Sequence, residues 1–121
     1  MAAPNLVNVA TITAKSVQAT LDTTLTTEIL ANASSSGKVF KVNAIIIANI
    51  DGSSAADASV AITKSGGSPI MIASTISVPA DATLVVIDKN SSIYLEEGDN
   101  IEAGAGAASD LTITISYEEL S

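Results

Sequence analysis

KVFKVNAIIIANI, residues 38–50, is the stretch of this chain that decides its fold. One alternating set of its residues is entirely apolar: Phe40, Val42, Ala44, Ile46, Ala48 and Ile50. The other set mixes apolar side chains with lysine and asparagine. Because successive side chains of a strand point to opposite faces, the pattern predicts a long strand. Its even-numbered residues are expected to face the core, and its other face is expected to be partly covered.

Shorter segments of β-branched or alternating residues flank this stretch, with glycine, proline, serine and aspartate turns between them. They predict strands at 6–13, 16–21, 25–31, 58–64, 70–78, 84–87, 92–95, 101–106 and 110–118. In the last of these, Leu111, Ile113, Ile115 and Tyr117 are expected to face the core. Residues 19–33 are the one helix candidate, but their threonines favour a strand or a loop.

Strands that recur with turn residues between them are typical of an all-β sandwich or barrel. We therefore predict one domain over residues 1–121, an all-β, single antiparallel β-sandwich, with a jelly-roll-like strand order compatible with the pattern. The first basic residue is Lys15, so no secretory signal is expected. The apolar run 42–50 is too short for a transmembrane helix, so we expect no membrane partner.

The composition argues against catalysis, because the chain has no histidine, cysteine, arginine or tryptophan. These residues supply most proton carriers, activated nucleophiles and soft metal ligands. The carboxylate pairs at 96–97 and 118–119 are adjacent in sequence, so on a strand they point to opposite faces and do not converge on a substrate. We expect a protein that is not an enzyme and needs no cofactor. The three aromatic residues, Phe40, Tyr94 and Tyr117, are expected in the core.

The charge pattern also limits the partners. Thirteen acidic residues against five lysines give a net charge of −8, which disfavours a nucleic-acid partner. The acidic segment 96–102 offers oxygen ligands that suit calcium: Glu96, Glu97, Asp99 and Glu102. Their spacing does not match an EF-hand loop, so a solvated turn is the favoured interpretation. Asp51 and Asp57 are explained by turn hydrogen bonds, and we expect no metal site.

The surface is expected to be poorly charged. Charged residues make up 15% of the chain, below the roughly 25% of ordinary globular domains. Many outward positions of the predicted strands are therefore threonine, serine, alanine or isoleucine. Apolar surface of this kind is usually covered by a partner, and this favours a homo-oligomer over a monomer.

Three stretches together resemble a known class of protein. They are GKVFKVNAIIIANIDG (37–52), ISVPADATLVVI (76–87), and IYLEEGDNI (93–101) leading into DLTITISYEE (110–119). They are similar to short, β-rich virion structural proteins of tailed phages, particularly phages of marine cyanobacteria. The resemblance spans about residues 37–119 and brings no catalytic residues with it.

The resemblance implies a non-enzymatic virion structural protein. The first expectation is a capsid decoration (cement) protein, which stabilises the outer shell by subunit–subunit contacts. The alternative is a neck, tail or fibre-associated structural module, or one that binds a host surface. The expected partners are copies of the chain itself, with a trimer favoured, and the major capsid protein or other virion proteins. The expected location is the phage particle, after synthesis in the host cytoplasm.

The N-terminal stretch 1–6 is a candidate arm toward a neighbouring subunit. Its low charge and its Pro4–Asn5 pair disfavour a helix. The candidate contact residues are Ala2, Ala3, Pro4, Asn5 and Leu6.

Deletion of residues 2–6 should weaken binding to the particle without affecting the fold, because an arm adds contacts but no core. Co-sedimentation with particles measures the binding, and circular dichroism measures the fold. Undiminished binding after the deletion would refute the arm.

Overall fold

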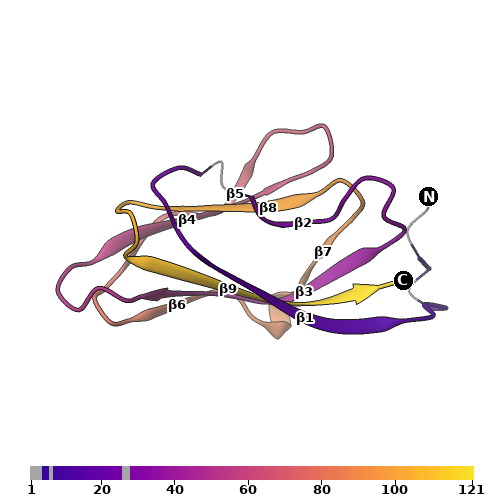
Figure 1. The fold of residues 1–121 in the computed structure, drawn as a ribbon, viewed down its shortest axis with the longest axis horizontal. Helices are drawn as coiled ribbons and strands as arrows, with labels where there is room; N and C mark the ends of the chain where they lie inside the picture. Colours follow the sequence, from indigo (N-terminus) through magenta and orange to yellow (C-terminus); the bar gives the residue numbers. More distant parts are fainter. Residues whose placement is uncertain (1–3, 6, 26–27) are drawn as a thin grey trace.

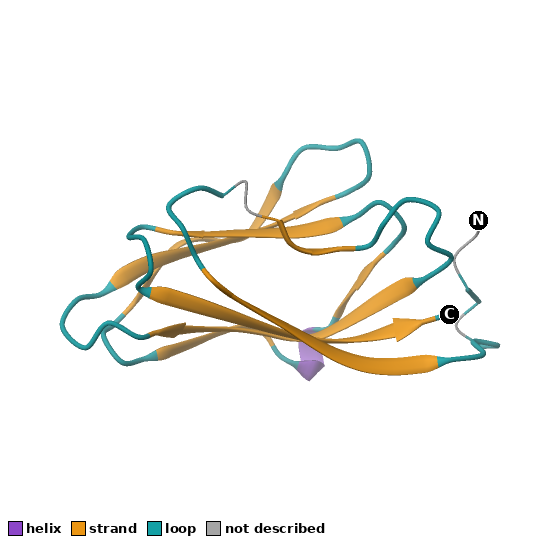
Figure 2. Ribbon diagram, viewed as in Figure 1, coloured by secondary structure: helices purple, strands orange, loops and turns teal. Residues whose placement is uncertain are grey.

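The strands form a two-layered, all-β sandwich (Figures 1 and 2). The computed structural model describes residues 4–5, 7–25 and 28–121. The strands are β1 (Ile12–Thr20), β2 (Glu28–Ala31), β3 (Val39–Asn49), β4 (Ala56–Thr63), β5 (Ile70–Val78), β6 (Thr83–Ile87), β7 (Ile93–Leu95), β8 (Asn100–Ala105) and β9 (Leu111–Leu120). A short 3-10 helix, η1 (Lys89–Ser91), joins β6 to β7 and begins at the capping residue Asp88. The predicted antiparallel sandwich is confirmed.

The strand order is that of a jelly roll. Sheet A has the order β1-β9-β3-β6, with β7 also paired to β3, and sheet B has the order β2-β8-β4-β5. The antiparallel pairs β1–β9, β2–β8, β3–β6 and β4–β5 show that the chain folds as one long hairpin with its tip between β4 and β5. This hairpin is rolled so that its strands are shared between two sheets, as in other jelly rolls.

The predicted first strand, 6–13, is wrong for most of its length. The regular strand begins at Ile12 and continues to Thr20. Before it, the Asn5 side-chain oxygen accepts a hydrogen bond from Val7 N, and the Asn5 carbonyl accepts one from Asn8 N. Asparagine readily forms such local turns, and they divert the chain before it meets β9. The alternation of side chains before Ile12 was therefore not sufficient to identify a strand.

A β-bulge in β3 reverses the predicted burial of its second half. The register between β3 and β9 shifts between Val42 and Ala44, and a bulge of one residue changes which face later side chains occupy. Phe40 and Val42 are buried as predicted. Beyond the bulge, the buried residues are Ile45, Ile47 and Asn49, whereas Ala44, Ile46, Ala48 and Ile50 are partly or fully exposed. The expectation that these four face the core is wrong.

The core lies between the two sheets. The predicted inward set of β9, Leu111, Ile113, Ile115 and Tyr117, is confirmed as buried. The Phe40 and Tyr117 rings pack with their centroids 5.1 Å apart. Tyr94 is 46% exposed, so its predicted core position is wrong, because the neighbouring Leu95 takes the inward side of β7.

Gly104 on β8 lets the β1–β2 connection cross sheet B closely. A Cβ atom at this position would lie 2.8 Å from the backbone oxygen of Thr24, which is too close for a real contact. A glycine inside a strand often marks such a close approach of another backbone segment.

The bulge gives a paired prediction. Ile45→Ala should cost about 2–5 kcal/mol of unfolding free energy, because it empties a fully buried site. Ile46→Ala should cost less than about 1 kcal/mol, because Ile46 is 37% exposed. Urea denaturation measures both changes. Equal costs, or a larger cost at Ile46, would contradict the reversed burial.

Candidate functional site

Two buried asparagines join loops to the sandwich. Asn49 Nδ2 donates to the carbonyls of Ser54 and Val78, both at 2.9 Å, and its Oδ1 accepts from Asp51 N. Asn32 Nδ2 donates to the carbonyls of Lys38 and Leu95. Each of these buried amides satisfies backbone groups that would otherwise be unpaired. Their role is structural.

Two carboxylates of the acidic segment 96–102 bind a lysine. Lys64 Nζ lies 2.6 Å from Asp99 Oδ2 and 2.6 Å from Glu96 Oε2. Asp99 is 1% exposed, and it also accepts hydrogen bonds from Ser65 N and Glu96 N. We call Lys64, Glu96 and Asp99 the Asp99 cluster.

Opposing effects set the pKa of Asp99. Burial raises it, but the hydrogen bond from Lys64 and those from the backbone of Glu96 and Ser65 outweigh burial, so the pKa lies below its usual value. Hydrogen bonds to Asp99 and Glu96 raise the pKa of Lys64. Asp99 and Lys64 are therefore charged at neutral pH, and their contact links the β4–β5 turn to the loop before β8.

The other carboxylates of this segment have separate partners. Glu97 Oε2 accepts from Gly37 N at 3.0 Å, and Glu102 Oε1 accepts from the Thr63 hydroxyl at 2.6 Å. Asp51 Oδ1 accepts from the backbone and hydroxyl of Ser53, as expected for a turn. In the described residues, no set of three or more acidic side chains is arranged to hold a metal ion.

A second charged group lies near the chain ends. One carboxylate oxygen of Glu119 lies 2.9 Å from Lys15 Nζ, and the other lies 3.0 Å from Lys38 Nζ. Burial raises the pKa of Glu119, but the hydrogen bonds from Lys15 and Lys38 hold it below its usual value. The bond to Glu119 raises the pKa of Lys15. This group ties β1 and the segment before β3 to β9.

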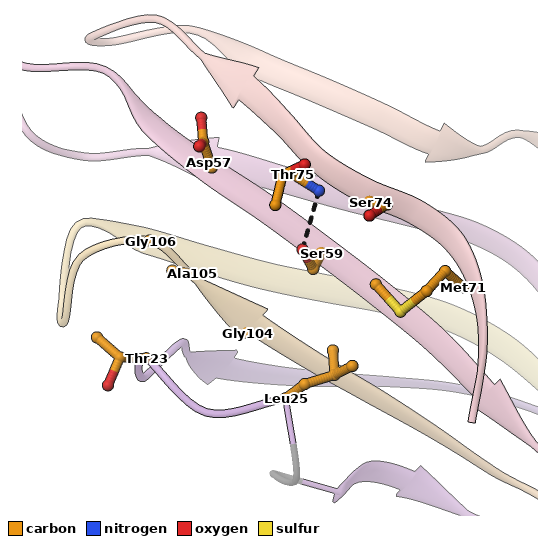
Figure 3. A pocket seen from close by; sticks show the side chains of 10 residues that line it. All are labelled: Thr23, Leu25, Asp57, Ser59, Met71, Ser74, Thr75, Gly104, Ala105 and Gly106. Carbon is orange, nitrogen blue, oxygen red and sulfur yellow. Dashed lines mark hydrogen bonds between the residues drawn. The ribbon is translucent and has the colours of Figure 1, made fainter. Parts of the chain in front are cut away.

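A shallow hollow of about 310 Å³ lies beside sheet B (Figure 3). Its lining residues are Thr23, Leu25, Asp57, Ser59, Met71, Ser74, Thr75, Gly104, Ala105 and Gly106. The Ser59 hydroxyl accepts a hydrogen bond from Thr75 N at 3.0 Å. One carboxylate among hydroxyl groups provides hydrogen bonds for a polar ligand. It does not provide the base and nucleophile pair that covalent catalysis needs.

An almost uncharged stretch of the sequence carries exposed apolar side chains. Between Lys64 and Asp88, Asp81 is the only charged residue, and β5 and β6 from this part of the chain contact each other. Large apolar side chains are exposed on them: Ile70 (65%), Met71, Ile72, Ile76 and Val85 (55%). We call these five residues the neutral flank. Ile46, directly opposite Val85 on β3, extends it.

The candidate arm is only partly described. Ala2, Ala3 and Leu6 lie outside the described residues. Pro4 is half-buried, and Asn5 is exposed in the turn that precedes β1. Neither Pro4 nor Asn5 lines the hollow or contributes to the Asp99 cluster.

Comparison of the chain with protein-family models, curated proteins and solved structures finds no match. The structure of the described ranges contains no helix with the length and apolar character needed to cross a membrane.

Asp99→Asn should lower the unfolding free energy at pH 7 by about 2 kcal/mol, because an amide cannot replace the charged partner of Lys64. A carboxyl group with a lowered folded-state pKa stabilises the fold above its unfolded pKa of about 3.9. This contribution is lost as the pH falls through the folded-state pKa. The difference between wild type and variant should therefore shrink below about pH 4. Denaturation from pH 7 to pH 3 measures it.

The control is Asp57→Asn, which alters an exposed carboxylate. It should leave stability within about 0.5 kcal/mol of wild type. A difference for Asp99→Asn that stays constant with pH would show that the charge of Asp99 does not stabilise the fold.

Proposed function

We propose that this protein is a non-enzymatic virion structural protein, a capsid decoration protein that adheres to the outer shell of a phage head and assembles with copies of itself. Its action is binding through apolar and backbone contacts, without a chemical step. The proposal joins the resemblance of residues 37–119 to the surface properties of the described residues.

The neutral flank is the observation that carries this proposal. A chain of net charge −8 has one charged residue, Asp81, in residues 65–87, and this stretch carries exposed isoleucine, methionine and valine. Burial of apolar surface contributes roughly 25 cal/mol per Å². Contact through Ile70 and Val85 would thus contribute about 1–2 kcal/mol for each side chain. When many copies bind one shell, small contributions of this kind add up.

The architecture and the charge agree with this proposal. Jelly rolls occur in viral capsid and lectin domains, although a fold by itself does not determine function. The negative charge favours the outside of a head over the DNA-facing interior, because DNA phosphates repel it. In the described residues, the carboxylates of Glu96, Asp99 and Glu119 form ion pairs with lysines, which gives them a structural role.

The second candidate is a tail- or fibre-associated module that binds a host surface. The hollow beside sheet B favours it, because the hydroxyl groups there and Asp57 offer hydrogen bonds to a sugar. A glycan array tests this function directly. Selective binding that Asp57→Ala abolishes would support this candidate over decoration.

The proposal is tested by co-sedimentation with phage heads that lack their decoration protein, and with isolated tails. We expect saturable binding to heads at a fixed ratio. The double variant Ile70→Asp/Val85→Asp should bind at least about tenfold more weakly, because it would bury two charges without partners. Both sites are more than half exposed, so the fold should tolerate the change.

Ala108→Asp is the matched control. It adds an acidic residue at an exposed loop position between β8 and β9, outside the five residues of the neutral flank, and should leave binding unchanged. Binding to tails alone would support the second candidate. Absence of binding to heads, or equal binding by the double variant, would overturn decoration through the neutral flank.

A further inference from the structure

β1 is an edge strand with an unusually regular free side. It pairs with β9 residue for residue from Ile12 to Thr20, without a register shift. It lies at the end of sheet A, with no second strand partner in the described part of the chain (Figure 1). Such an edge presents a row of unpaired backbone groups to any strand that approaches.

The alternation of hydrogen bonds between β1 and β9 shows which backbone groups of β1 point away from β9. Thr11 and Ser121 exchange both backbone bonds, each at 2.9 Å, and Leu21 N donates to Leu111 O. Opposed residues of an antiparallel ladder alternate between bonded and non-bonded pairs, so the odd-numbered residues of β1 bond to β9. The even-numbered residues therefore direct their N–H and C=O groups outward: Ile12, Ala14, Ser16, Gln18 and Thr20.

The other edges of the described sheets, β2, β5, β6 and the three-residue strand β7, are short or irregular. β5 shifts register against β4 at two points, and bulges of this kind hinder pairing with a further strand. β2 has four residues and a register shift, and β6 has five residues and a shift against β3. β1 is the edge of the described sheets that is both long and regular.

The one charged residue of β1 does not protect this edge. An outward lysine is a common means of preventing edge-to-edge pairing. Lys15 instead binds Glu119 on β9 at 2.9 Å, where the Glu119 side chain is only 13% exposed. The lysine is thus held toward β9 by a carboxylate that it shares with Lys38.

We propose that β1 is the self-association edge of this protein, and that it pairs antiparallel with β1 of a second copy about a twofold axis at Ser16. The pairing joins the two copies of sheet A into one continuous sheet. This dimer rests on the self-assembly proposed above, and β1 is the surface through which that assembly would occur.

The alternation of outward backbone groups and the charge of β1 both favour a second copy of the chain as the partner at this edge. With the axis at Ser16, the outward residues pair with one another: Ser16 with Ser16, Ala14 with Gln18, and Ile12 with Thr20. The chain has no acidic residue before Asp22. Two molecules of net charge −8 therefore meet here along strands that carry no negative charge, and each Lys15 is bound to Glu119 of its own chain.

The test is the native mass by light scattering across dilution. We expect a reversible dimer of two 12.1 kDa chains, instead of the trimer implied by the resemblance. Ser16→Pro removes an outward N–H but no bond to β9, and proline is tolerated on the solvent side of an edge strand. This variant should be monomeric at concentrations where wild type and Ser16→Ala are dimeric.

A second pair of variants does not depend on proline. Ser16→Lys places like charges directly opposite each other across the axis and should raise the dissociation constant at least about tenfold. Ser116→Lys adds the same charge on the adjacent β9 residue and should change it much less. In amide exchange, Ala14, Ser16 and Gln18 should gain protection on dimerisation, whereas odd-numbered residues of β1 are protected in both states.

A monomer at all concentrations, a trimer, or a dimer unaffected by both Ser16→Pro and Ser16→Lys would overturn the proposal. A strand of another protein bound at this edge in place of a second copy would also overturn it. Failure here is distinct from failure of the decoration function, because the neutral flank variants test shell binding and the Ser16 variants test mass.

Discussion

The β-bulge between Val42 and Ala44 is the constraint on which the rest of the sandwich depends. β3 is the central strand of sheet A, and β9 pairs with it along nearly its whole length. On its other side, β7 pairs with residues before the bulge and β6 with residues after it. The bulge lets one strand serve both neighbours while Phe40 and Ile45 each point into the core. Without it, one half of β3 would turn its apolar face to water.

The strand positions could largely be predicted from the sequence, because turn residues separate segments of alternating side chains. The facing of β9 could be predicted because its outward residues are threonine and serine. The facing of β3 could not be predicted, because both alternating sets of residues are apolar around Ile45 and Ile46. A shift of one residue therefore does not change the apolar pattern of the sequence there. The start of β1 was missed because a strand needs a partner, and β9 reaches only from Ile12 onward.

The candidate sites show the same division. The lack of histidine, cysteine and arginine is visible in the composition alone. The roles of Asn32 and Asn49 were not visible, because their partners are backbone carbonyls brought together only by folding. Lys64 and Asp99 are far apart in the sequence, so no local motif indicates that they form an ion pair. Exposure of Ile70 and Val85 depends on β5 and β6 being edge strands, which the sequence does not specify.

The closure of sheet A by β9 has a consequence for synthesis. β9 is made after every other described strand, and it supplies a partner to both β1 and β3. While the chain leaves the ribosome, β3 has already been made but lacks the strand that will cover one of its two edges. An apolar strand with an open edge is prone to aggregate, and contacts between distant segments form slowly. Rapid docking of β9 would therefore shorten the time during which this edge of β3 is open to pairing with other chains.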